Sequence, residues 1–172
     1  PFSPALVQVL VAVSSMLQRE RTALKVMLQL LVNQRDTLEL GQLVAVGDLF
    51  DVIAEGDEAF NEQMRQYFDG ARRLWATKLR PMLETQHGAT EEELAGRPWG
   101  DPVAAAFRAD ARLLKTLLIA ALVPNVDAVR ALDARRLGAL NHGSLKAPIP
   151  GQEDSLIVGR LRNWAANVGE IH

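Results

Sequence analysis

The chain has 172 residues, of which 48% are hydrophobic and 23% charged, and these proportions are typical of one globular domain or two small ones. Nineteen Lys and Arg residues against 21 Asp and Glu residues give a net charge of −2, which excludes a uniformly basic protein that coats nucleic acid. The chain contains no Cys, which excludes disulfides, thiolate zinc sites and cysteine nucleophiles.

The apolar runs and the ends of the chain give expectations about cellular location and about the extent of the protein. No apolar run reaches the roughly 18 residues that span a bilayer, and the N-terminus lacks a signal-peptide pattern. We therefore expect a cytoplasmic protein without a membrane partner. The sequence opens with Pro1-Phe2-Ser3-Pro4 and no initiator Met, so we expect it to be part of a longer protein.

The first part of the chain is predicted to form two packed helices. Ser3 followed by Pro4 is a typical helix start, and it predicts a helix over about 4–17 that is apolar on nearly all sides and buried on most of them. A second helix over 20–33 is expected to pack on the first through apolar residues at 3.6-residue spacing. These residues are Ala23, Leu24, Met27, Leu28, Leu30 and Leu31.

The next segment is expected to hold one short and one long helix. The apolar run 43–46 is short enough for a strand, but it has no partner for a sheet and stops at Gly47 and Asp48, where a short helix to about 56 begins. The apolar spacing over 57–84 predicts a long amphipathic helix with a kink near Pro81.

The second half of the chain begins after a Gly- and Pro-containing boundary over 86–101. Within it, Thr90 and Glu93 have the spacing of a capping box. Asp101-Pro102 predicts the start of a helix that ends before Pro124, and a further helix is expected over about 126–140 with a break at Asp133. In the last helix, after Gly151, we expect Trp164 to be buried against the helix that contains Leu113 to Ala121.

The expected fold class is all-α. We predict a helical bundle over 1–89 and a winged-helix-like unit over 90–172 that is truncated before the wing. The second unit has three helices followed by an incipient strand at Glu170-Ile171-His172, which is the order of a winged-helix domain. Its last two helices are joined by a connection longer than the usual three or four residues.

The patterns that carry catalysis are missing from the sequence. There is no Gly-x-x-x-x-Gly-Lys-Ser/Thr phosphate loop, no pair of His residues at helical ligand spacing and no Gly-x-Ser-x-Gly elbow. We therefore predict no catalytic residue and no metal ligand in this chain.

Two basic features are candidate binding sites. Arg19 and Arg21 stand at the start of a helix, where positive charge opposes the macrodipole unless an anion or acidic partner is present. The alternative is a solvated turn in which Glu20 pairs locally. Residues 102–172 carry nine Lys or Arg against six acids, and the last helix could bring basic and amide groups to DNA. The DNA candidates are Lys146, Arg160, Arg162 and Asn163; the alternative is a solvated helix face.

Several short motifs together resemble a known family. They are Pro1-Phe2-Ser3-Pro4, Leu-Gln-Arg-Glu-Arg-Thr-Ala-Leu over 17–24, Val46-Gly47-Asp48-Leu49, Leu140-Asn141-His142-Gly143 and Leu161-Arg162-Asn163-Trp164-Ala165. In combination they resemble the large P-loop ATPases of phage-exclusion defence, the Pgl and BREX systems. The resemblance implies that the parent protein has an AAA+-like core that binds ATP, followed by a helical lid and winged-helix-like regions. It also implies other subunits of a defence complex as partners.

The segment Arg21-Thr22-Ala23-Leu24 also looks like the Arg-x-Ala-Leu that opens a lid helix in origin-recognition-type AAA+ proteins. That resemblance implies that Arg21, or Arg19 in its place, approaches the nucleotide. The expected function is a non-catalytic segment that couples nucleotide state to contacts with DNA or a partner subunit. The alternatives are a helical interaction scaffold that docks through the helix over 57–84, and a stand-alone winged-helix DNA-binding module.

Overall fold

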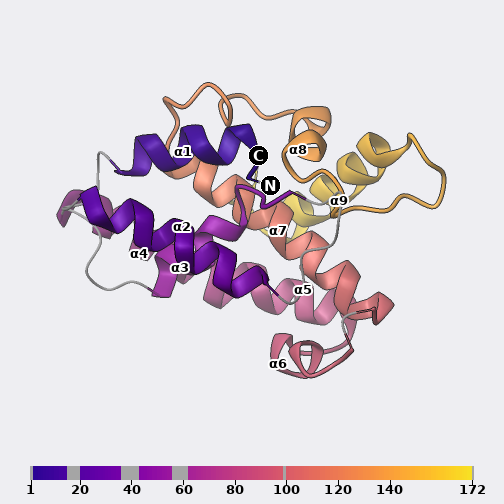
Figure 1. Cartoon of the computed structure of the whole chain (residues 1–172). Helices are drawn as coiled ribbons and strands as arrows, with labels where there is room; N and C mark the ends of the chain where they lie inside the picture. The colour runs from indigo at the N-terminus through magenta and orange to yellow at the C-terminus, as the bar shows by residue number, and fades with distance from the viewer. Residues whose placement is uncertain (1, 15–19, 36–42, 56–61, 99, 172) are drawn as a thin grey trace.

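The computed structural model describes residues 2–14, 20–35, 43–55, 62–98 and 100–171 (Figure 1). Within these ranges the regular structure is helical, and the all-α prediction is confirmed. The helices are α1 (Pro4–Ser14), α2 (Glu20–Gln34), α3 (Asp48–Glu55), α4 (Glu62–Leu74), η1 (Trp75–Leu79), α5 (Arg80–His87), α6 (Glu91–Ala95), α7 (Pro102–Leu122), α8 (Ala134–Leu140) and α9 (Glu153–Asn167).

The start of α1 is fixed by local chemistry and by one backbone pairing. The Ser3 hydroxyl accepts a hydrogen bond from the Leu6 backbone N–H at 3.1 Å, which satisfies one of the donors that a helix start leaves free. Phe2 forms an isolated parallel bridge with Val44, and the Ser3 backbone N–H donates to the Val44 carbonyl at 3.2 Å. The apolar run 43–46 therefore holds the N-terminal segment in place without forming a sheet.

The burial of α1 and α2 differs from the sequence prediction. α1 was expected to be buried on most sides, but Val7 and Val11 are exposed while the opposite side is buried. In α2 the predicted inner face is confirmed only in part: Leu30 is buried in the core and Met27 packs against it, whereas Leu24, Leu28 and Leu31 are exposed. Both helices are apolar around more of their circumference than one contact can cover, so periodicity alone could not select the buried side.

The long helix predicted over 57–84 is present from residue 62 as α4, η1 and α5, which follow one another directly, and its expected start lies outside the described residues. The expected irregularity occurs just before Pro81, where η1 is a π-helical segment. Pro81 cannot donate a backbone hydrogen bond and its ring crowds the carbonyl one turn earlier, so the wider turn accommodates it.

The predicted caps of the second half are confirmed. Thr90 and Glu93 form the reciprocal capping box of α6, and the Asp101 carboxylate accepts from the Ala104 backbone N–H at 2.9 Å at the start of α7. The helix predicted over 126–140 was wrong in its first half: residues 124–132 form turns, and α8 begins at Ala134 with Asp133 as its N-cap. A strand was expected at residues 170–172, but Gly169 and Glu170 form a turn and Ile171 has no regular structure, while His172 lies outside the described residues.

The 21-residue helix α7 runs through the middle of the molecule, with the N-terminal helices on one side and α8 and α9 near the other (Figure 1). It spans about 30 Å. It contacts α3, α4, α5 and α6, and the hydrophobic core extends from Ala5 to Val168. Trp164 of α9 is fully buried in this core, as predicted. The division at residue 89 into two units stays a prediction.

Candidate functional site

The sequence-predicted site residues are carried by separate elements. Arg19 lies outside the described residues, and Arg21 lies in the first turn of α2, where its side chain is not described. Lys146 is exposed in the connection between α8 and α9. Arg160, Arg162 and Asn163 all lie on α9. Arg160 and Asn163 are three residues apart and only about 60° from each other around the helix, whereas Arg162 lies about 160° from Arg160 on another side.

Arg160 is engaged inside the protein. Its guanidinium forms an ion pair with Asp110 of α7, and the Arg160 side chain is 21% exposed whereas Asp110 is fully buried. Arg162 and Asn163 are exposed. Of the candidates for DNA contact, Arg160 therefore has a structural partner that would have to be released before it met a phosphate.

Asp110, which is fully buried, is the centre of a polar network that joins three helices. Besides Arg160 of α9, it accepts a hydrogen bond from Gln86 Nε2 of α5 at 3.0 Å, and His87 Nε2 lies 2.9 Å from the same carboxylate oxygen. The Trp164 indole N–H donates to Gln86 Oε1 at 3.0 Å, so the amide of Gln86 is bonded at both ends. This network fixes α5 and α9 on α7.

The carboxyl group of Asp110 has a perturbed affinity for protons. Burial raises the pKa of Asp110 above its usual range, because a charged carboxylate loses hydration in the interior. The positive charge of Arg160 and the bonds from His87 and Gln86 act in the opposite direction. The surface caps behave differently: hydrogen bonds from the backbone N–H groups of Ala104 and Thr90, respectively, lower the pKa of Asp101 and Glu93.

A groove of about 470 Å³ opens beside this network between α5 and α9. It is lined by Lys78, Met82, Thr85, Gln86, Asn163, Asn167 and Val168. Most of its polar groups already have partners: Lys78 pairs with Glu170, and Thr85 donates to the Pro81 carbonyl. Asn163 faces this groove, and Arg162, the preceding residue, lies about 100° away around α9. These two DNA candidates therefore do not form one surface patch.

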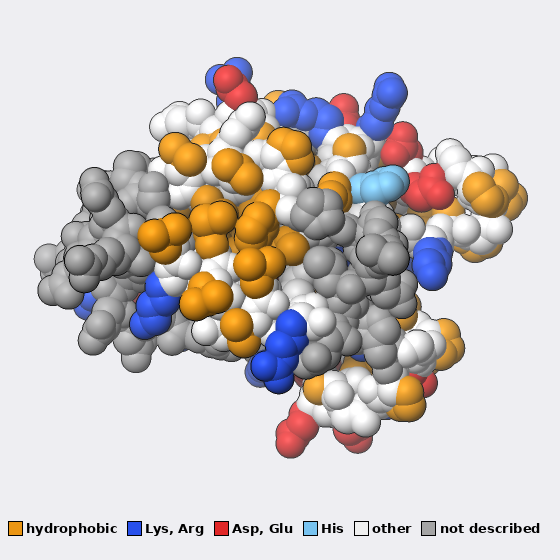
Figure 2. Space-filling model, viewed as in Figure 1, with side chains coloured by type: hydrophobic (Ala, Val, Ile, Leu, Met, Phe, Trp, Pro, Cys, Tyr) orange, Lys and Arg blue, Asp and Glu red, His pale blue; other side chains and the backbone are white. Residues whose placement is uncertain are grey.

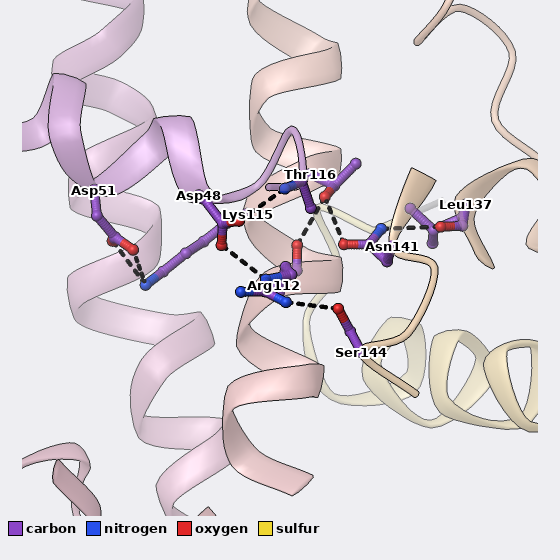
Figure 3. Close-up of polar contacts among 9 residues, drawn as sticks. Asp48, Asp51, Arg112, Lys115, Thr116, Leu137, Asn141 and Ser144 are labelled. Carbon is purple, nitrogen blue, oxygen red and sulfur yellow. Dashed lines mark hydrogen bonds and ion pairs between the residues drawn. The ribbon is translucent and has the colours of Figure 1, made fainter. Parts of the chain in front are cut away.

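A second polar network lies on another side of α7 and is drawn in Figure 3. Arg112 Nε donates to Asp48 of α3 at 2.7 Å, and Arg112 Nη1 donates to Ser144 Oγ at 2.6 Å. The second carboxylate oxygen of Asp48 accepts a hydrogen bond from the Ala45 backbone N–H at 2.8 Å. One arginine therefore ties the start of α3 and the connection after α8 to α7.

The same network continues through Thr116 to α8. Its hydroxyl donates to the Arg112 carbonyl at 2.8 Å and lies 3.2 Å from Asn141 Oδ1, and Asn141 Nδ2 donates to the Leu137 carbonyl at 2.9 Å. Thr116 and Asn141 are both buried, so these bonds satisfy groups that water does not reach. Asn141 therefore links the C-terminal end of α8 to α7.

Lys115 binds α7 to α3 and to the π-helical segment. Its ammonium lies 2.7 Å from Asp51 of α3 and 4.6 Å from the centre of the Trp75 ring in η1. Lys115 is 9% exposed, so its charge is stabilised by the carboxylate and the ring face rather than by water. We call Asp110, Arg112, Lys115 and Thr116 the α7 polar hub.

Gly47 brings α3 into direct contact with α7. A Cβ built at this position would lie 2.4 Å from the Arg112 carbonyl oxygen and 2.9 Å from Thr116 Oγ1. Only a residue without a side chain fits here, and the close approach sets the distance across which Asp48 and Arg112 pair.

The sequence patterns did not predict the α7 polar hub. The signal that could have identified it is the placing of Asp110, Arg112 and Lys115 within a helix whose other residues are mostly apolar. Each charged residue that a helix carries into the core needs a partner from another element. The partners themselves lie 23 to 64 residues away along the chain, and no local pattern connects them.

The α7 polar hub is suited to holding helices together. In the described part of the chain no group of three or more His, Asp and Glu side chains is placed to hold a metal ion. No helix among the described residues is long and apolar enough to cross a bilayer. The charged side chains of the α7 polar hub form ion pairs with residues of α3 and α9, and these pairs cross-link the helices.

Four of the motifs that carried the family resemblance are parts of this architecture. Phe2 and Ser3 bond Val44, Gly47 packs on α7, and Asn141 bonds Thr116. Trp164, in the motif over 161–165, is buried and donates a hydrogen bond to Gln86. In this chain these residues therefore hold the helices against one another.

Comparison with known proteins agrees with these motifs. No solved structure matches the chain. A family model described as the second domain of the BREX system ATPase PglY matches residues 1–172. Because this match covers the whole sequence, the chain belongs to the family of PglY second domains, a part of the ATPase of a BREX phage-defence system.

Proposed function

We propose that this domain is a non-catalytic coupling element of a PglY ATPase, which transmits the nucleotide state of the parent protein to a contact with another BREX subunit or with DNA. The observation that carries the proposal is the α7 polar hub, which cross-links helices on several sides of α7. ATP binding itself is assigned to the rest of the parent, because this sequence has no phosphate loop.

The α7 polar hub supports coupling because it resists internal rearrangement. Separating a buried ion pair leaves uncompensated charge, at a cost of about 3–5 kcal/mol. Asp110 with Arg160 and Arg112 with Asp48 are two such pairs, and they lie in contact with different helices. A displacement applied to α3 is therefore passed through α7 to α9 as a movement of the whole body.

We further propose that residues 1–89 act as the lid-like part and that Arg21, or Arg19, approaches the nucleotide of the parent. A guanidinium can give two parallel donors to a phosphate, which a Lys ammonium cannot reproduce. In full-length PglY, Arg21→Lys should already lower ATP turnover, and Arg21→Ala should lower it by about 10²–10³-fold if the arginine stabilises transition-state charge. Harm from Arg19→Ala with normal turnover in Arg21→Ala would transfer the role to Arg19.

For the winged-helix-like unit we propose that DNA contacts, where they occur, come from Lys146, Arg162 and Asn163, which are exposed. Arg160 is the least available of the original candidates because Asp110 holds it. Contacts of this type go to phosphates and weaken as salt rises. Arg162→Ala should reduce the log–log salt slope of duplex binding by full-length PglY by about 0.9.

The coupling proposal is tested by breaking the α7 polar hub in full-length PglY. Arg112→Gln removes the ion pair with Asp48, whereas Arg97→Gln removes a surface pair with Asp101 and serves as the control. The affinity for the partner subunit or DNA is measured with ATP and with ADP. Wild type and Arg97→Gln should show a nucleotide-dependent affinity, with a ratio in the range of about 5–150-fold that is usual for coupled sites.

In Arg112→Gln the ratio should approach one, while ATP affinity stays close to that of the wild type. Nucleotide dependence that survives in full in Arg112→Gln would contradict coupling through the α7 polar hub. An affinity that is independent of nucleotide in wild type would favour the alternative, a helical scaffold without nucleotide dependence.

A further inference from the structure

Six large apolar side chains of α1 and α2 remain exposed, and we call them the α1–α2 face. They are Val7 (45% exposed), Val11 (67%), Leu24 (70%), Leu28 (63%), Leu31 (48%) and Val32 (44%). Figure 2 shows apolar side chains gathered over these two helices, which contact each other. Single exposed apolar residues are ordinary, but a contiguous set of this kind marks a surface that is normally covered.

The α1–α2 face is additional to the sides of the helices that build the core. In α1, Leu6, Val9 and Leu10 are buried while Val7 and Val11, one turn apart, point outward. In α2, Val26 and Leu30 are buried while the exposed residues follow each other at the spacing of a single helix stripe. Each helix therefore has two apolar sides, and the described fold covers only one.

The chemistry of the α1–α2 face is that of an interface centre. α1 contains no charged residue, and its exposed polar side chain beside Val7 and Val11 is the neutral Gln8. On α2 the exposed apolar residues are accompanied by Lys25, Gln29 and Asn33. Depletion of charge at the centre and polar groups around it are the composition of a protein–protein interface. Such a composition does not suit a phosphate backbone, which selects positive charge.

The position of α1 in the PglY polypeptide identifies the occupant. The matched family is the second domain of PglY, so in PglY proteins a first domain precedes it. α1 is the first helix of the described residues, and Val7 lies about one turn after its start at Pro4, about 5 Å along the helix axis. A domain that precedes this one in the same polypeptide is tethered on the N-terminal side of α1, and such a tether raises its effective concentration at a nearby surface.

We propose that the α1–α2 face is the docking surface of the first domain of PglY, within the same polypeptide. The inference rests on the proposed function, because it names the surface through which the coupling domain is joined to the remainder of the ATPase. The first domain is expected to present a complementary, largely uncharged apolar surface. Docking there would cover Leu24 and Leu28, the two most exposed leucines of the face.

The test compares the accessibility of two introduced thiols in full-length PglY. This domain contains no Cys, so Leu28→Cys and Ile149→Cys each place one thiol in it, and the original side chains have similar exposure, 63% and 57%. Ile149 lies in the connection between α8 and α9, away from the α1–α2 face, and is the matched control. Maleimide labelling is followed by mass spectrometry of the peptide that carries each thiol, at two protein concentrations.

We expect Leu28→Cys to react at least about tenfold more slowly than Ile149→Cys, which corresponds to a closed state favoured by about 1.4 kcal/mol. The protection should be the same at both concentrations, because the covering domain is in the same chain. Equal labelling of the two thiols would overturn the proposal. Protection that disappears on dilution would also overturn it and would assign the face to a second copy.

A second thiol keeps the test independent of one substitution. Leu24→Cys replaces the most exposed residue of the α1–α2 face, so it should not disturb the core, and it should be protected like Leu28→Cys. Failure of this experiment is distinguishable from failure of the coupling proposal. The coupling experiment reads the nucleotide dependence of partner affinity in Arg112→Gln, whichever surface joins the two domains.

Discussion

Substitution of Gly47 by Ala is expected to separate α3 from α7. The added Cβ would lie 2.4 Å from the Arg112 carbonyl oxygen, and real Cβ contacts are essentially never shorter than 3.0 Å, so the gap must widen by at least 0.6 Å. The obstructing oxygen belongs to the backbone of a central helix and cannot move aside as a flexible side chain would. The neighbouring pair Asp48–Arg112, now at 2.7 Å, is stretched by the same displacement.

The magnitude follows from the cost of placing an extra methyl group in a packed interior. We expect Gly47→Ala to lower the free energy of unfolding by about 2–3 kcal/mol, the upper part of the range for overpacking, because the clash is with backbone. Small domains are stable by about 5–15 kcal/mol in total, so a loss of this size is easily measured.

The assay is urea unfolding of the 172-residue chain followed by circular dichroism and by the fluorescence of its buried Trp residues. Gly159→Ala is the control, since Gly159 is exposed in α9 and a Cβ there meets no atom within 4 Å. That substitution should raise stability by about 0.5–1 kcal/mol, because Ala favours a helix interior over Gly. A Gly47→Ala protein as stable as wild type, or stabilised like Gly159→Ala, would refute the close approach of α3 to α7.

Three other predictions follow from the buried contacts. Trp164→Ala should lower the free energy of unfolding by about 3–5 kcal/mol. Trp164→Phe keeps a ring but loses the hydrogen bond to Gln86, and should lower it by about 1 kcal/mol. If both variants were as stable as wild type in urea unfolding, Trp164 would not lie in the core. Arg160→Ala should lower the free energy of unfolding by about 3–5 kcal/mol, because it leaves Asp110 buried without its cation. Arg162 is exposed, so Arg162→Ala should change stability by less than about 0.5 kcal/mol. A larger loss of stability in Arg162→Ala than in Arg160→Ala would place Arg160 at the surface. The raised pKa of Asp110 means that the fold binds its proton more tightly than the unfolded chain does, so its contribution to stability is greatest at low pH and falls as pH rises through the folded pKa. Urea unfolding at a series of pH values should show this fall in wild type but not in Asp110→Asn, and the same pH slope in both proteins would contradict the burial of that carboxyl. Asp101 and Glu93 have lowered pKa values and give the opposite dependence, a loss of stability as pH falls, which should be weaker in Asp101→Asn than in wild type.

Features that depend on neighbouring residues could be predicted from the sequence. The capping box of Thr90 and Glu93 and the cap at Asp101 are set by residues three positions apart, and both were found as expected. The irregularity near Pro81 was predicted for the same reason, since the clash of proline is with the preceding turn. Most helices were located because their apolar spacing extends over many residues.

Features that depend on distant partners could not be predicted. The buried side of α2 is chosen by which neighbour it contacts, and a helix with Leu and Val around most of its circumference gives no local signal for that choice. Residues 126–132 have helical apolar spacing, but the chain turns there, and Arg136 donates to the carbonyls of Asp127 and Arg130. Tertiary contacts override a weak local preference in both cases.

The candidate site shows the same limit. A basic residue on the last helix is compatible with DNA binding and with an internal ion pair, and only the position of Asp110, 50 residues away, distinguishes them for Arg160. Arg162 and Lys146 have no such buried partner among the described contacts and stay candidates for DNA contact. Arg21 stays the candidate for nucleotide contact, because its role depends on parts of PglY outside this domain.

The claim that this domain transmits movement as one body is tested most directly by a distance across α7 in full-length PglY. Spin labels at Arg73→Cys in α4 and Arg162→Cys in α9, both exposed positions, report the separation of elements on different sides of α7, with other cysteines of the parent replaced. The account predicts the same narrow distance distribution with a non-hydrolysable ATP analogue and with ADP, and a broadened one in Arg112→Gln. A distance distribution that shifts between the two nucleotide states in wild type, where the α7 polar hub is intact, would show that the domain deforms internally. That result would contradict the proposed rigid coupling.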